Sequence, residues 1–389
     1  MMNKFFILLL SACCLLMTAC DKENDETAQG FRVMKADVDL VAGGGTVEVA
    51  LQATGELTAV SGADWCRVIE VTNEKITLLV RANYEYTSRA TQVTVSDGNS
   101  EQKIVVTQEG NIFAPDSDQQ VIRLGNAPSQ TIVRVNSSFD FKVSVQRGID
   151  WLEVPAASKE DGSLLVLKEN KTGNPRACQL LVSTNEGRKF FYYVYQYEVT
   201  DLLGAWGNSR IYVKWDTKDI EDAYPLSATE ISKNVDGEGY TIKMSLANTP
   251  AAQYLKDPAK ATVSLQATYK NGSFVVPIGA AQKDFTVVEE VADEAAEGAS
   301  DGTSDDGAGV VLQTLYGFSV AASSNIYSKG NFGFAPVLYQ DGSVGISFQD
   351  VAGAPESGCY LAIALFDEQQ FLTGTLKDYI LFPDIALFR

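Results

Sequence analysis

The sequence predicts an all-β protein with two tandem β-sandwiches followed by an antiparallel β-barrel or jelly-roll-like domain. Three observations support this fold class. A block of about 80 residues occurs twice, short β-branched runs separated by turn residues fill both halves, and no long window has helical periodicity. The 389 residues leave room for about two to four domains, and 45% hydrophobic residues are enough for packed cores.

The charge balance and the missing histidine exclude several classes of function. The chain has 50 acidic and 31 basic side chains, a formal net charge of −19 and no histidine. Nucleic acid is not an expected partner, because phosphate binding needs clustered Lys and Arg. Ser-His-Asp and Cys-His catalysis, His-ligated metal sites and imidazole switches cannot be built.

The first twenty residues have the layout of an export signal. Lys4 precedes an apolar run that is too short to span a bilayer permanently, and two small residues precede Cys20. This ending resembles the lipobox of bacterial lipoproteins, although Met17 replaces the usual aliphatic residue. The resemblance implies a lipoprotein signal peptide at 1–19 and lipidation of Cys20. An ordinary signal peptide cut elsewhere, or a buried N-terminal helix, is the alternative.

An acidic tether, residues 20–30, follows. Its sequence Asp-Lys-Glu-Asn-Asp-Glu directly behind the cysteine resembles the export signal of Bacteroidetes lipoproteins displayed on the outer face of the outer membrane. The same composition also produces a solvated, flexible linker. We therefore expect a lipid-anchored protein of the outer membrane, exposed at the cell surface.

The remaining cysteines give no disulfide framework. Cys66, Cys178 and Cys359 fall one in each candidate domain, among residues typical of buried strands. Lone buried cysteines behave as small hydrophobic side chains, and without histidine none is expected to act as a catalytic thiolate.

The internal repeat defines the two sandwiches, at 31–110 and 117–198. Its spacing drifts by one residue at a time, as loop-length changes between strands would produce. The matched positions are Asp64-Trp65 and Asp150-Trp151, Asn83 and Asn170, Arg89 and Arg176, and Gln108 and Gln196.

Each copy is expected to be an immunoglobulin-like sandwich, because about 80 residues hold about seven short strands. Ser96-Asp-Gly-Asn99 predicts a hairpin between the last two strands of the first copy. Clear strand patterns in that copy lie at 46–51, 75–80, 90–95 and 102–107.

The constellation Asp64-Trp65, Asn83, Arg89 and the closing Val-Thr-Gln-Glu-Gly at 106–110 resembles the BACON domain of Bacteroidetes lipoproteins and polysaccharide-degrading enzymes. The second copy departs from the pattern, since it ends Val-Tyr-Gln-Tyr-Glu without the glycine. The resemblance implies a carbohydrate partner, host mucin or dietary polysaccharide, although such domains also serve as spacers.

The motif residues themselves are expected to be structural. A tryptophan repeated in both copies, at 65 and 151, fits a core position better than a sugar-stacking one. We expect Arg89 and Arg176 to bind loop carbonyls or an acidic neighbour.

A more specific candidate site than the motif residues lies in the last strand of the second copy, Phe190-Phe-Tyr-Tyr-Val-Tyr-Gln-Tyr197. Aligning Gln196 with Gln108 turns Tyr192 and Val194 inward. The opposite face then forms a candidate platform for a glycan or protein, unless the C-terminal domain buries it. The platform residues are Phe191, Tyr193, Tyr195 and Tyr197.

Residues 201–389 form the C-terminal β domain, with Asn271-Gly272 and Asp341-Gly342 as tight turns. Gly204-Ala-Trp206 resembles the Gly-x-Trp opening of lipocalin-like, or calycin, barrels. That resemblance implies an interior for a small apolar ligand, although side chains alone can fill an eight-stranded barrel. Predicted strands lie at 211–216, 239–244, 261–269, 273–278 and 343–348.

The segment 288–309 is acidic and rich in small residues, and predicts a flexible loop. Its carboxylates Asp301, Asp305 and Asp306 invite a calcium interpretation. Their spacing does not fit the EF-hand, so a solvated loop is favoured and no metal is expected.

No glycine-rich phosphate loop, nucleophile elbow or zinc motif occurs, so no enzyme and no cofactor are predicted. Glycoside hydrolysis needs only carboxylates, but nothing in the sequence locates a pair. We predict a non-catalytic cell-surface lipoprotein that binds glycan or a host protein, with the sandwiches as its stalk. The alternatives are an assembly subunit of an outer-membrane complex that binds no sugar, and a carrier of a small apolar ligand.

Overall fold

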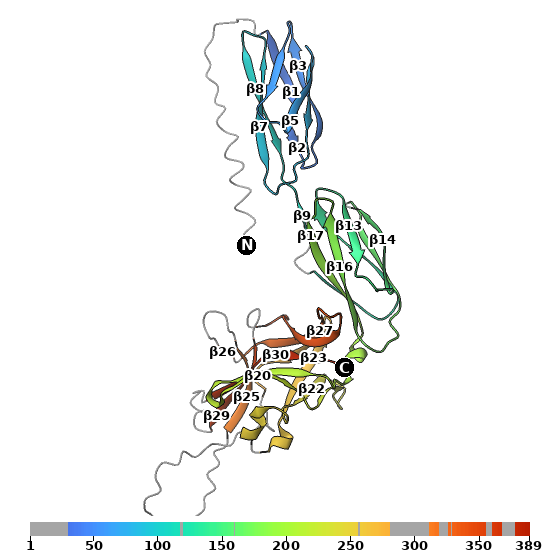
Figure 1. Cartoon of the computed structure of the whole chain (residues 1–389), viewed down its shortest axis with the longest axis vertical. Helices are drawn as coiled ribbons and strands as arrows, with labels where there is room; N and C mark the ends of the chain where they lie inside the picture. The colour runs from blue at the N-terminus through green and yellow to red at the C-terminus, as the bar shows by residue number, and fades with distance from the viewer. Residues whose placement is uncertain are drawn as a thin grey trace, which may run out of the picture. The chain divides into compact units, whose positions relative to one another are not determined.

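The computed structural model describes residues 30–116, 120–158, 160–255, 257–280, 311–318, 326–327, 329–354, 360–367 and 378–389. The predicted signal peptide, Cys20, Cys359 and the loop 288–309 lie outside these ranges. The described chain divides into two compact all-β units (Figure 1). The first runs through Phe113 and includes Ser137–Phe139, and the second holds Ala114–Asn136 and Asp140–Arg389.

The first unit is an immunoglobulin-like sandwich. Its strands are β1 (Phe31–Ala36), β2 (Asp39–Leu40), β3 (Gly45–Ala53), β4 (Thr58–Ser61), β5 (Cys66–Val71), β6 (Lys75–Val80), β7 (Arg89–Ser96) and β8 (Glu101–Gln108). They form two sheets, in the orders β1-β3-β6-β5 and β2-β8-β7-β4. The predicted hairpin joins β7 and β8, whose inward residues alternate with exposed ones along each strand.

The second unit begins with the second sandwich. Its strands are β10 (Val121–Leu124), β11 (Ser129–Val133), β13 (Phe141–Val145), β14 (Leu152–Ser158), β15 (Gly162–Leu167), β16 (Arg176–Thr184) and β17 (Lys189–Gln196). The sheet orders are β10-β17-β16-β13 and β11-β15-β14. Two further short strands are β9 (Phe113–Pro115) and β12 (Val135–Ser137).

The two sandwiches share one pairing scheme, which confirms that the repeat is structural. The order β3-β6-β5 recurs as β11-β15-β14, and β2-β8-β7-β4 recurs as β10-β17-β16-β13. In both copies, one short strand pairs in parallel with the last strand: β2 with β8 in the first copy, and β10 with β17 in the second. The inward prediction for Tyr192 and Val194 is also confirmed, since they are 4% and 0% exposed.

The C-terminal part of the second unit is a strongly curled antiparallel half-barrel. Its elements before residue 280 are η1 (Val199–Leu202), β18 (Gly204–Ala205), β19 (Arg210–Trp215), η2 (Asp216–Lys218), β20 (Ile220–Pro225), β21 (Thr229–Lys233), β22 (Tyr240–Ser245), η3 (Pro250–Tyr254), η4 (Pro258–Lys260), β23 (Thr262–Lys270) and β24 (Ser273–Pro277). The later ones are β25 (Val311–Phe318), β26 (Ile326–Tyr327), β27 (Asn331–Leu338), β28 (Val344–Gln349), β29 (Tyr360–Asp367) and β30 (Asp378–Ala386).

These strands form a seven-stranded sheet, β18-β21-β22-β23-β24-β27-β28, and a six-stranded sheet, β20-β19-β30-β29-β25-β26. An isolated bridge between Ile346 of β28 and Leu387 links the two sheets. Both predicted tight turns are present: Asn271-Gly272 joins β23 to β24, and Asp341-Gly342 lies between β27 and β28.

The half-barrel is filled by large side chains. Trp206, the predicted Gly-x-Trp tryptophan, is 1% exposed, donates its indole N–H to the Leu202 carbonyl at 3.0 Å, and lies under the Arg389 guanidinium. These contacts place the tryptophan in the core of the half-barrel. The largest fully buried side chains there are Trp206, Trp215, Phe274, Phe334 and Phe382.

Candidate functional site

The repeated arginine and glutamine form a hydrogen-bond network at one end of each sandwich. In the first, they lie opposite each other on β7 and β8, and Arg89 Nε donates to Gln108 Oε1 at 2.9 Å. Arg89 Nη2 also donates to the carbonyls of Arg81 and Ala82, at 2.7 and 3.1 Å. The Gln108 amide, 1% exposed, donates to the carbonyls of Ala42 and Arg81.

The second sandwich repeats the main hydrogen bonds of this network. Arg176 Nε donates to Gln196 Oε1 at 2.9 Å, and Arg176 Nη2 donates to the Lys168 carbonyl at 2.7 Å. Gln196 Nε2 donates to the same carbonyl at 3.0 Å. The prediction that both arginines bind loop carbonyls is therefore confirmed.

The repeated tryptophans belong to the same network. Arg89 stacks over Trp65 at 4.4 Å from the ring centroid, and Arg176 over Trp151 at 4.6 Å. Trp151 is buried, whereas Trp65 is half-buried against the first core. Because these side chains contact one another and the backbone, they stabilise the sandwich, as expected of structural residues.

The predicted tyrosine platform is not an open surface. Tyr195 and Tyr197 are only 6% and 5% exposed, and they belong to the core of the half-barrel. The Leu338 N–H donates to Tyr195 Oη at 3.1 Å, and Tyr197 Oη donates to the Gly272 carbonyl at 2.6 Å. This burial raises the pKa of both phenols and corrects the expectation that they face a ligand.

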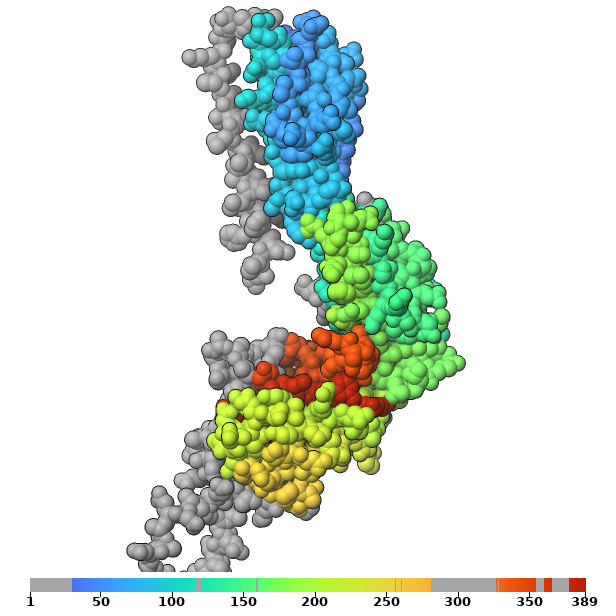
Figure 2. All heavy atoms as spheres, viewed as in Figure 1, coloured from blue at the N-terminus to red at the C-terminus, as the bar shows by residue number. Residues whose placement is uncertain are grey.

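The other two platform residues are half-buried. Tyr193 packs at the edge of the same core and accepts a hydrogen bond from Gln179 Nε2 at 3.3 Å, and Phe191 lies two residues earlier on β17. The physical reason is that the turn between β23 and β24 and the end of β27 lie against the outward face of β17 within the second unit. In Figure 2, the atoms of the C-terminal strands, in orange and red, pack against those of the second sandwich, in green.

The described cysteines are buried, as expected. Burial raises the pKa of the Cys66 thiol, and it raises the pKa of Cys178 to about 12. Neither is therefore a thiolate at neutral pH. Within the described ranges, no group of three or more Cys, Asp or Glu side chains is arranged to hold a metal ion.

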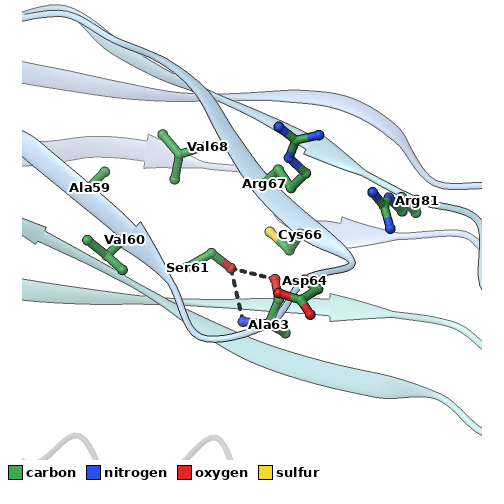
Figure 3. Close-up of a pocket in the computed structure, with 9 residues that line it drawn as sticks. All are labelled: Ala59, Val60, Ser61, Ala63, Asp64, Cys66, Arg67, Val68 and Arg81. Carbon is green, nitrogen blue, oxygen red and sulfur yellow. Dashed lines mark hydrogen bonds between the residues drawn. The ribbon is translucent and has the colours of Figure 1, made fainter.

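The better candidate site is a groove in the first sandwich (Figure 3), between β4 and β5. These two strands are the open edges of the two sheets, and the loop after Ser61 joins them. The groove has a volume of about 510 Å³, within the range of sites for small molecules and short chains. Cys66 lies at its floor, Val60 at its rim is 68% exposed, and Asp64 is exposed in the loop.

Two arginines lie at one end of this groove. Arg67 is opposite Leu79 in the β5–β6 pairing, and Arg81 follows two residues after Leu79. The Arg81 N–H donates to the Trp65 carbonyl at 2.8 Å, so the ladder continues to this residue. Residues two apart on a strand face the same side, which makes Arg67 and Arg81 diagonal neighbours, and such residues lie about 7–8 Å apart with their Cβ atoms somewhat closer.

Neither arginine has an ion-pair partner among the described residues. Sequence reasoning missed both, because it examined the residues that the two copies share and not those in which they differ.

Residues 55–109 match the BACON family, whose description is "Putative binding domain, N-terminal". The match spans β4 to β8 and includes the groove, and it confirms the BACON resemblance for this part of the first sandwich. No curated protein matches the chain. The lipoprotein and calycin assignments stay predictions.

Solved structures give only distant similarity. An endo-fucoidan hydrolase of glycoside hydrolase family 107, MfFcnA4, is 11% identical over 44% of this chain, with a TM-score of 0.26. The chain covers 29% of that enzyme's length. A chimeric titin Z1Z2 protein is 11% identical with a TM-score of 0.29, over 43% of this chain and 96% of its own. The titin I-band fragment I67-I69 is 10% identical with a TM-score of 0.23, over 55% and 92%. These scores carry no argument about function.

In the described ranges, no helix combines the length and apolar character that crossing a membrane would require.

Proposed function

We propose that the protein is a non-catalytic, lipid-anchored protein of the outer membrane that binds a glycan at the cell surface, through the groove between β4 and β5. The groove within residues 55–109 is the observation that carries the proposal, since the matching family is described as a binding domain. The glycan is host mucin or a dietary polysaccharide, and a host protein is the other candidate partner.

The chemistry of the groove supports this role. Ser61, Asp64, Arg67 and Arg81 supply hydroxyl, carboxylate and guanidinium groups that can pair with sugar hydroxyls, while Val60 supplies an apolar surface. The half-barrel and the second sandwich act as holders in this proposal, and neither is assigned a reaction.

Affinity electrophoresis of the full chain through gels containing mucin or plant polysaccharides tests the binding. We expect at least one glycan to retard the protein, and Asp64→Ala to weaken that retardation several-fold, because a hydrogen bond to a charged group is lost. Glu56→Ala, which removes an exposed carboxylate outside the groove lining, is the matched control. A folded chain that binds no glycan, or that releases products from one, contradicts the proposal.

The anchor is tested separately. Mass spectrometry of the membrane-extracted protein should find an acylated Cys20 at the mature N-terminus, and Cys20→Ser should release the chain from membranes, since the acyl chains hold it there. An unmodified N-terminus elsewhere would remove the lipoprotein part of the proposal.

A further inference from the structure

The two sandwiches differ at two equivalent positions in the groove region. Glu153 of β14 occupies the place of Arg67, because each is the second residue after the repeated tryptophan. Lys168 occupies the place of Arg81. Its N–H donates to the Trp151 carbonyl at 2.8 Å, as the N–H of Arg81 does to Trp65.

The carbonyl of each residue confirms the equivalence. The Arg81 carbonyl accepts from Arg89 Nη2 and Gln108 Nε2 at 2.7 and 3.1 Å. The Lys168 carbonyl accepts from the corresponding arginine and glutamine at 2.7 and 3.0 Å. The two pairs of side chains therefore occupy the same diagonal of the same sheet.

In the second sandwich the two positions carry opposite charges and pair with each other. Lys168 Nζ lies 3.1 Å from Glu153 Oε1. In the first sandwich both positions are arginine, and neither has a partner among the described residues. Two like charges on one diagonal repel each other, although the chain as a whole has an excess of acidic residues that could supply a counter-charge.

We propose that Arg67 and Arg81 form a site for the anionic groups, carboxylate or sulfate, of an acidic glycan. The inference rests on the proposed function and names its ligand class. Guanidinium forks bind planar carboxylates and sulfate oxygens in pairs of charge-assisted hydrogen bonds. The rest of the same groove, with Ser61 and Asp64, accommodates the uncharged part of the glycan chain.

The edges that flank the groove favour a glycan over an extended acidic peptide. A peptide would add to a free strand edge through its backbone. However, β4 has only four residues, and a register shift between Val68 and Glu70 interrupts β5. Short and bulged edges resist strand addition, so recognition falls to the side chains.

The test compares four polymers against the full chain by titration calorimetry: dextran sulfate, polygalacturonate, unsubstituted dextran and polyglutamate. We expect binding of dextran sulfate or polygalacturonate, which distinguishes sulfate from carboxylate, with an affinity that falls as salt is raised. Dextran should bind much more weakly. General attraction of a polyanion is not expected from a chain of net charge −19, so such binding reports a local site.

Arg67→Glu is the decisive variant, because it recreates the opposite-charge pair of the second sandwich and should keep the fold. We expect it to lower the affinity for the acidic polymer about tenfold or more. Lys171→Glu makes the same charge change at an exposed position of the second sandwich and should leave the affinity unchanged. Arg67→Lys, which keeps the charge without the fork, should retain part of it.

The other outcomes separate this inference from the proposed function. Acidic-glycan binding that survives Arg67→Glu, or binding of neutral glycans alone, overturns the inference and leaves the proposed function standing. Binding of polyglutamate without any glycan overturns the inference and replaces the glycan of the proposed function with its other candidate, a protein partner. No binding to any mucin, plant polysaccharide or test polymer removes both.

Discussion

At the scale of single residues, a buried glutamine organises one end of each sandwich. Gln108 accepts from Arg89 and donates to the backbone carbonyls of Ala42 and Arg81, and it is almost fully buried. Its side-chain amide both accepts and donates hydrogen bonds, so the polar groups around the partly buried arginine have partners. This allows the arginine to remain charged there.

Gln108→Ala should therefore destabilise the first unit by about 2–3 kcal/mol, since it leaves the Arg89 Nε–H without its acceptor and removes the amide's hydrogen bonds to two backbone carbonyls. Chemical denaturation measures the free energy of unfolding. Gln92→Ala, at an exposed position of the adjacent strand β7, should change it by less than about 0.5 kcal/mol. Equal effects of the two variants would mean that the network contributes little.

Cys178 predicts a dependence on alkaline pH. Burial raises the pKa of its thiol from 9.0 to about 12. Above pH 9 the thiol of the unfolded chain ionises while that of the folded chain keeps its proton. The stabilisation is thus complete below pH 9 and is lost as the pH rises towards 12, by up to about 1.4 kcal/mol per pH unit.

Unfolding titrations between pH 8 and 11 test this effect. Cys178→Ala should show a shallower loss of stability with pH than the natural chain, because the other groups that titrate in this range are common to both. Identical slopes would show that the folded thiol ionises normally.

At the scale of elements, tight hairpins fix the position of the strands that meet the second sandwich. Gly272 and Gly342 both have positive φ, of 79° and 86°. A Cβ on Gly342 would meet open space, whereas one on Gly272 would lie 2.6 Å from Arg123 Cδ and 2.8 Å from Tyr197 Oη.

Gly342→Ala should therefore cost about 1–2 kcal/mol for the left-handed backbone alone. Gly272→Ala should cost about 1 kcal/mol more, because the new methyl group also disturbs the hydrogen bond from Tyr197 to the Gly272 carbonyl. Denaturation of the second unit measures both values. A cost of Gly272→Ala no larger than that of Gly342→Ala would contradict the close contact.

At the scale of the whole molecule, the second sandwich and the half-barrel form one compact unit, and one face of the sandwich contributes side chains to the core of the half-barrel. Tyr195 and Tyr197 enter that core, and Arg389 donates to the Gly173 carbonyl at 3.1 Å and to Asn174 Oδ1 at 2.6 Å. The first unit has its own separate core.

Calorimetry should accordingly resolve two transitions. Tyr195→Ala should lower only the one that belongs to the second unit, by about 3 kcal/mol, because it opens a cavity and frees the Leu338 N–H. Val60→Ala, at an exposed residue of the first unit, should move neither. A shift of both transitions in Tyr195→Ala would show that the units unfold together.

The repeat and the alternation of apolar residues were enough to predict the all-β class, the two sandwiches, both tight turns and the inward face of β17. These features depend on neighbours in sequence and on pairs of adjacent strands. The role of Arg89 could likewise be predicted, since a polar residue repeated beside a core tryptophan needs backbone partners.

What covers the outward face of β17 was decided only by tertiary structure. Alternation along a strand shows which side chains share a face, but not whether solvent or another sheet lies against that face. For Tyr195 and Tyr197, the half-barrel lies against it. The groove likewise depends on β4 and β5 ending their sheets side by side. The charge difference between Arg67 and Glu153 can be read from the sequence. Only the strand register shows that Arg67 lies beside Arg81 and that Glu153 lies beside Lys168.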